Sequence, residues 1–161
     1  MKKLNNIIVL LLVAFFALSC TKSAEKEAVK KNEPCRKIVS TAPSITETLF
    51  DLGLGENIVG VTENCHYPEA AKSKPKIGKA FDINVEAVAA LKPDTVFVLS
   101  AYGELAGKLQ SLGIKTVVVE QSTVRGFIDS IDVFGKSCSI EEKTAKFKEK
   151  FVPYQIGRAH V

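Results

Sequence analysis

Two pairs of side chains in this sequence have residue types that could carry out chemistry. Cys65 and His66 are adjacent and could supply a nucleophile with its base, or two ligands for a metal. Ser44 and Glu47 could act as a hydroxyl nucleophile and a base. Both pairs are incomplete, because adjacent side chains seldom point at one another and one His with one Cys makes no full metal site. We therefore assign no catalytic residue and no metal site, and a metal-dependent or hydrolytic enzyme is kept only as an alternative.

His66 is the one histidine that precedes residues 155–161. A neutral imidazole can bind the metal of a chelate, so ligand contact is one interpretation, and a surface hydrogen-bonding residue is the other. The chain has no GxGxxG after a predicted strand and no GxxxxGK[ST]. No motif therefore supports binding of a dinucleotide or of a nucleotide phosphate.

Four apolar, β-branched segments are predicted to be strands that position these residues, at 37–40, 58–61, 95–99 and 115–119. Helices are predicted after them, at 44–52 with Ser44 and Glu47 as a capping box, from the N-cap Asn84, at 104–112 and at 124–135. Residues 77–79 form a minor extended piece and 80–83 a loop. This alternation predicts a doubly wound α/β sheet, whose strand-exit loops share one edge.

Three cysteines follow residue 20, and none belongs to a CxxC pair. Cys35 precedes the first strand, and Cys138 follows a helix that returns to the same edge of the sheet. A disulfide between Cys35 and Cys138 is compatible with this topology in an exported protein. Cys65 follows the second strand at the opposite edge, so we expect its thiol to be free.

Residues 1–20 have the pattern of an export signal, with Lys2 and Lys3 before a short apolar run. The ending ALSC resembles the lipobox of bacterial lipoproteins, which implies lipidation of Cys20, although Ala17 stands where that motif prefers Leu. A plain cleaved signal is the alternative. Removing the two lysines lowers the formal charge from +4 to +2, and charges of both signs are interleaved, which argues against nucleic acid. Residues 21–34 are polar and predict a hydrated tether.

The C-terminal segment mixes Glu and Lys at helical spacing. Ser139 and Glu142 repeat the capping-box pattern, and a narrow apolar stripe predicts a long, solvated helix that bridges two parts of a protein. The ending QIGRAHV is what a common sequencing adaptor would encode, so an artefact is expected there, with a natural short tail as the alternative. We expect five parts: signal peptide 1–20, tether 21–34, lobe 35–138, start of an inter-lobe helix 139–154, and adaptor 155–161.

The order of motifs in residues 37–151 resembles that of substrate-binding lipoproteins of ABC importers for cobalamin and iron chelates. The carrying segments are IVSTAPSITETLFDLGLGENIVGVTENCHYPEA, INVEAVAALKPDTVFV and KLQSLGIKTVVVE. The resemblance implies the N-terminal lobe of a two-lobed binding protein that has a helical backbone. It also implies a lipid-anchored, extracytoplasmic monomer without a cofactor, which hands its ligand to a permease and its ATPase.

The resemblance also implies which residues face the ligand: Ala42, Pro43, Ser44, Asn64, His66, Tyr67, Ala80, Phe81, Ser100 and Tyr102. Glu86 matches a surface glutamate that meets permease arginines in such proteins. Asn64, Ala80 and Ser100 stand where cobalamin binders have aromatic residues, although Phe81 and Tyr102 are adjacent. A single lobe is expected to bind cobalamin or a ferric chelate no better than micromolar. A receptor lobe that passes its ligand to a signalling partner is a further alternative.

Overall fold

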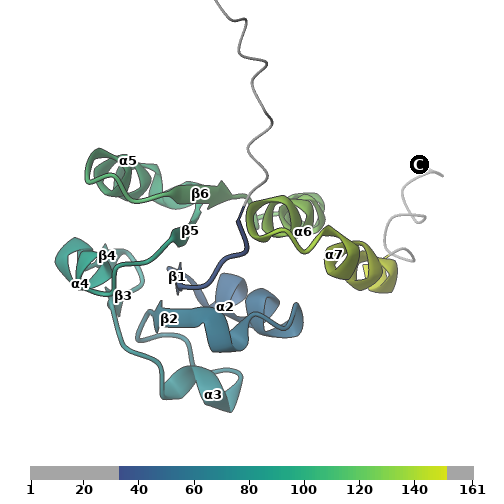
Figure 1. Ribbon diagram of the computed structural model, residues 1–161, viewed down its shortest axis with the longest axis horizontal. Coiled ribbons are helices and arrows are strands. Elements are labelled where there is room, and N and C mark those ends of the chain that lie inside the picture. Colours follow the sequence, from purple (N-terminus) through teal and green to yellow (C-terminus); the bar gives the residue numbers. More distant parts are fainter. Residues whose placement is uncertain (1–32, 152–161) are drawn as a thin grey trace, which may run out of the picture. The chain divides into compact units, whose positions relative to one another are not determined.

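The computed structural model describes residues 33–151, and Figure 1 shows their arrangement. Four parallel strands form the main sheet: β1 (Ile38–Ser40), β2 (Ile58–Val61), β5 (Thr95–Leu99) and β6 (Thr116–Val119). Their order is β2-β1-β5-β6, so β1 and β5 are central. The predicted fold class, a doubly wound α/β lobe, is confirmed. The predicted signal peptide with Cys20, the tether up to residue 32 and residues 152–161 lie outside the described residues, so the predictions about them stay predictions.

Helices cover both faces of the sheet because the strands alternate their apolar side chains between the faces. Phe97 packs edge-to-face on Phe134, with ring centroids 4.9 Å apart, in the core beneath α2 (Pro43–Asp51) and α6 (Val124–Cys138). Val96 and Val98 belong to the second core, beneath α4 (Val85–Ala90) and α5 (Gly103–Ser111). In Figure 1, α4 and α5 accordingly lie on one side of the strands and α2 and α6 on the other.

Smaller elements complete the lobe. The 3₁₀ turns η1 (Gly55–Asn57) and η2 (Ser100–Tyr102) precede β2 and α5, and α3 (Glu69–Lys72) follows β2. The segment predicted as a loop at 80–83 is instead half of a hairpin, because β3 (Gly78–Lys79) pairs antiparallel with β4 (Asp82–Ile83). Asn84 caps α4 as predicted, since its Oδ1 accepts from the Ala87 N–H at 2.9 Å.

Both predicted capping boxes are wrong. Helix α2 begins one residue early at Pro43, with Ala42 as an N-cap that makes no side-chain bond. Proline favours the first helical position, because its φ is preset and its missing N–H would have been unpaired there. Ser139 ends α6 in the left-handed conformation, with φ at 57°, and α7 (Glu141–Lys148) starts after Ile140.

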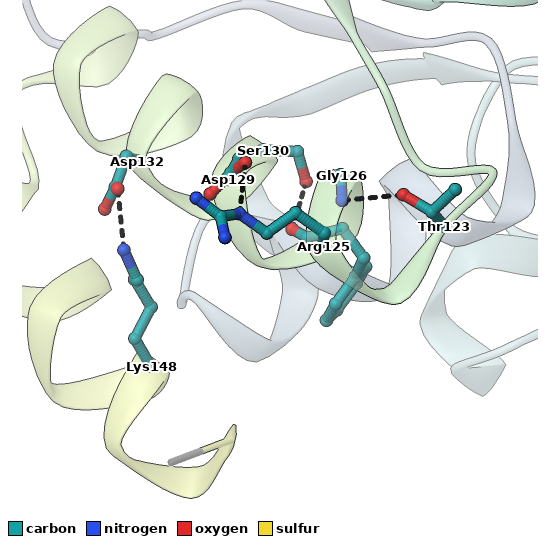
Figure 2. Close-up of polar contacts among 8 residues, drawn as sticks. Thr123, Arg125, Gly126, Asp129, Ser130, Asp132 and Lys148 are labelled. Carbon is teal, nitrogen blue, oxygen red and sulfur yellow. Dashed lines mark hydrogen bonds and ion pairs between the residues drawn. The ribbon is translucent and has the colours of Figure 1, made fainter. Parts of the chain in front are cut away.

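Helix α6 runs three residues past the predicted end because Gly135 is a contact point rather than a stop. A Cβ at Gly135 would lie 2.4 Å from Thr144 Oγ1, so the missing side chain lets α7 approach α6. Lys148 Nζ donates to Asp132 Oδ2 at 2.6 Å across the same pair of helices (Figure 2). The predicted long helix is therefore α7 followed by the 3₁₀ turn η3 (Glu149–Phe151), packed on α6. Its role as an inter-lobe connection stays a prediction.

Cys35 and Cys138 form a disulfide, with their Cα atoms 4.7 Å apart. This is the pairing that the topology allows, and it ties the segment before β1 to the end of α6. Cys65 is free and buried. In residues 33–151, no helix is both long enough and apolar enough to span a bilayer.

Candidate functional site

The segments that follow the four parallel strands meet at the carboxyl edge of the sheet. Thr41 follows β1 and donates its N–H to the Phe97 carbonyl of β5 at 3.2 Å. Thr62 follows β2, Ser100 follows β5 and Glu120 follows β6. Open α/β sheets bind ligands at this edge, so the lobe has its candidate site there.

Buried hydroxyl groups and a thiol join the first two of these segments. Thr46 Oγ1 donates to Ser40 Oγ at 2.8 Å and lies 3.2 Å from Cys65 Sγ, which also lies 3.2 Å from Thr62 Oγ1. Cys65 is fully buried whereas His66 is exposed, so the thiol bonds to hydroxyl groups under the loop rather than to the imidazole. This arrangement gives the Cys65 and His66 pair no nucleophile and base geometry. In the described part of the chain, no group of three or more His, Cys, Asp or Glu side chains could hold a metal ion.

The hairpin β3–β4 extends this edge with an exposed aromatic side chain. The Ala80 N–H donates to Asn64 Oδ1 at 2.9 Å, which joins the hairpin to the loop after β2. Phe81, at the hairpin turn, has a φ of 70° and is 85% exposed. Its ring lies edge-to-face on Tyr102, with centroids 5.2 Å apart. A non-glycine residue at positive φ is uncommon, and an exposed one that carries a large aromatic ring indicates a functional constraint.

A groove of about 620 Å³ runs beside this aromatic pair, between the hairpin and the start of α5. Its lining includes apolar side chains of α4 and α5 and three charged ones. The lining residues are Phe81, Asp82, Ile83, Val85, Ala101, Tyr102, Gly103, Glu104, Leu105 and Lys108. The surface therefore offers aromatic and apolar contact area to a ligand, together with a few polar groups that could orient it.

The predicted ligand-facing residues differ in how accessible they are. Ala42 is buried as the N-cap of α2, and Pro43 is half-buried. Ser44 and His66 are exposed, and Tyr67 is 68% exposed. The hydrogen bond from Ala80 to Asn64 joins the predicted loops 64–67 and 80–81. The ring contact of Phe81 with Tyr102 joins 80–81 to 100–102. Ala42 is buried in the described lobe, and the ligand role of all ten residues stays a prediction.

Glu120 is a residue of this edge that sequence reasoning did not assign to the site. Its Oε2 accepts from Ser100 Oγ at 2.6 Å, and its Oε1 accepts from the Ser122 N–H at 2.6 Å and from the Ser122 hydroxyl. The hydrogen bond from Ser100, followed by those from Ser122, lowers the pKa of Glu120 to about 2. The only sequence signal was its place as the first residue after a predicted strand.

The sequence profile of the periplasmic binding protein family matches residues 38–152. The chain belongs to this family. A relative in Bacillus subtilis (strain 168), the ABC transporter substrate-binding lipoprotein YvrC, is 35% identical over 133 residues, which are 80% of this chain and 42% of YvrC. The chain thus spans less than half of the length of that relative.

Solved structures of periplasmic binding proteins share this lobe. The vitamin B12-binding protein BtuF of Vibrio cholerae superposes with a TM-score of 0.67 and 28% identity, over 73% of this chain and 47% of that one. A solute-binding protein of Staphylococcus epidermidis ATCC 12228, described as a possible iron-binding protein, gives a TM-score of 0.66 and 27% identity, over 73% and 48% of the two chains. The described lobe therefore corresponds to about half of each of these binding proteins.

Proposed function

We propose that this lobe belongs to the solute-binding component of an ABC importer that captures cobalamin or a ferric chelate, including haem, outside the cytoplasm. The observation that carries the proposal is the contact of the exposed Phe81 with the half-buried Tyr102 beside the strand-exit loops, in a chain of the periplasmic binding protein family. Flat macrocycles and chelates offer apolar faces that aromatic rings can cover. Binding without chemistry agrees with a family of solute-binding proteins, and Cys20 would carry the lipid that anchors the protein.

The ligand is proposed to lie between this lobe and a second one, because the relatives are about twice as long. One lobe supplies only one wall of such a site, so the 161-residue chain alone should bind cyanocobalamin, haemin or ferrioxamine B no better than micromolar. The complete gene product is then the form in which binding is measured.

Replacing Phe81 by alanine in the complete gene product is expected to weaken ligand binding about 10-fold. This corresponds to about 1.4 kcal/mol, within the range for a buried aromatic contact. Isothermal titration with cyanocobalamin, haemin and ferrioxamine B measures the change. Leu112→Ala is the matched control, because Leu112 is also a large exposed apolar residue, 59% accessible, but follows α5 at the opposite edge of the sheet. Equal affinities of the Phe81 variant and the wild type contradict the proposed site.

Replacing Glu86 by lysine is expected to reduce uptake through the permease without changing ligand affinity. Glu86 is exposed in the first turn of α4, where it can meet a partner's arginine. The structural alternative is a favourable interaction with the helix dipole, worth about 0.3–1 kcal/mol. A vesicle uptake assay with permease and ATPase separates the two interpretations: a purely structural role lowers thermal stability and leaves uptake per folded protein intact.

A further inference from the structure

The Glu120 carboxylate occupies a defined position at the candidate ligand edge. It lies 2.6 Å from Ser100 Oγ, in the loop that also carries Tyr102. Strands β5 and β6 pair in parallel with Leu99 opposite Val119, so Ser100 and Glu120 leave the sheet side by side. Whatever ligand lies against the loop after β5 is therefore close to this carboxylate.

The start of α6 is shaped around the same side chain. A Cβ added to Gly126 would lie 2.7 Å from Glu120 Cγ, so only glycine leaves room for it there. The Gly126 N–H donates to Thr123 Oγ1 at 2.9 Å, which caps the helix (Figure 2). Glu120 is thus exposed, but its hydrogen bonds hold it between the exit of β5 and the first turn of α6.

No cation neutralises Glu120 among the described contacts. Its hydrogen-bond donors are the Ser100 hydroxyl, the Ser122 amide and hydroxyl, and the Gln121 amide, and all are neutral. Arg125, the first basic residue after Glu120 in the sequence, pairs with Asp129 at 3.3 Å (Figure 2). The strand-exit segments 41–44, 62–67, 100–102 and 120–122 contain two acidic residues, Glu63 and Glu120, and no Lys or Arg, whereas Lys79 and Lys108 belong to the hairpin and to α5 beside the groove.

We propose that Glu120 is a charge-selectivity residue, which disfavours ligands that present carboxylates or other anionic groups to this lobe and favours ligands with a neutral or cationic rim. The inference rests on the proposed function and narrows its substrate class. A corrinoid whose rim carries amides suits this edge, whereas a porphyrin that turns free propionates toward it does not. The low pKa of Glu120 keeps the charge present at any pH at which the protein would work.

Glu120→Gln in the complete gene product tests this proposal, because glutamine has the same shape and removes the charge. Its Oε1 keeps an acceptor for the Ser122 amide, and its Nε2 can donate to Ser100 Oγ in place of the bond that the carboxylate accepts. The probes are three pairs in which the second member is more negative: cyanocobalamin and its monocarboxylic acid, haemin dimethyl ester and haemin, and ferrioxamine B and its N-succinyl derivative. The variant is expected to bind the more negative member about 2- to 5-fold more tightly relative to its partner, the range for an exposed charge pair.

Salt and a distant charge provide the controls. The change in selectivity should shrink between about 0.05 M and 0.5 M salt, because exposed charges are screened. Glu142→Gln removes the same charge from α7, which begins near the disulfide at the amino edge of the sheet. This control variant should leave the ratio of affinities within each probe pair unchanged.

The outcomes separate the two proposals. An unchanged ratio in a Glu120→Gln variant that still binds overturns the inference and leaves the proposed function standing. An equal loss of affinity for both members of a pair also overturns it, because it shows a purely structural role. Failure of the wild type to bind any of the six probes contradicts the proposed function, and the inference with it.

Discussion

Replacing Cys35 and Cys138 together by alanine is expected to lower the free energy of unfolding by about 2–5 kcal/mol. The disulfide joins residues 103 positions apart, so it restricts the unfolded chain over almost the whole lobe. Both cysteines are also buried, at 3% and 1% exposure, so alanine avoids placing a hydroxyl in the core. Urea denaturation under oxidising conditions measures the difference.

The variant is expected to keep the native fold, because other bonds hold the segment before β1. Asp94 Oδ2 accepts from the Arg36 and Lys37 amides at 2.7 and 2.8 Å, and Asn57 Nδ2 donates to the Cys35 carbonyl at 2.9 Å. A phosphine reductant should bring the wild type to the stability of the variant and leave the variant unchanged. Equal stability of the two proteins without reductant contradicts the prediction.

The strands could be predicted because an apolar, β-branched run by itself indicates a strand that is buried on both faces. The strands at 58–61 and 95–99 have the bounds that their apolar, β-branched runs indicate. A run such as TVFVL has no polar face, so it must be covered on both sides, and helices on both faces of a parallel sheet provide that cover. Sequence order then sufficed to place the exit loops at one edge.

The helix ends were predicted less accurately than the strand bounds, because competing local patterns fit the same residues. Ser44 with Glu47 fits a capping box, but Pro43 suits the first helical position and Ala42 becomes the N-cap. Gly135 indicates a stop by residue type alone, whereas the packing of Thr144 against it explains why the helix continues. A local preference of proline decided the first case, and a tertiary contact decided the second.

The loops that form the candidate site could be predicted from the sequence, but the contacts between their residues could not. Topology places Ser100 and Tyr102 at the ligand edge, but the bond from Ser100 to Glu120 joins residues 20 apart, and that from Ala80 to Asn64 joins residues 16 apart. Such pairs leave no periodic signal in one sequence. The hairpin was missed for a similar reason, since two strands of two residues each are too short to show alternation.

A substitution in that hairpin, Gly78→Ala, is expected to lower the free energy of unfolding by about 2–4 kcal/mol. It should also weaken ligand binding, because it displaces Phe81. Gly78 has a φ of +111°, and a Cβ there would lie 2.4 Å from the Asp82 carbonyl oxygen, which belongs to the backbone and cannot rotate away. Two other glycines separate these causes. Gly113 has a φ of +76° with open space around it, so Gly113→Ala should cost only about 1 kcal/mol.

Gly107 lies inside α5, and a Cβ added there would meet no atom within 4 Å, so Gly107→Ala should stabilise the lobe by about 0.5–1 kcal/mol through helix propensity. Thermal or urea unfolding of the three variants should therefore rank Gly107→Ala above the wild type, Gly113→Ala below it and Gly78→Ala lowest. Only Gly78→Ala should also change affinity for the probes, because the hairpin that it distorts carries Ala80 and Phe81. A Gly78 variant as stable as the Gly113 variant would show that the hairpin backbone shifts to accept the Cβ, and would contradict the predicted displacement of Phe81.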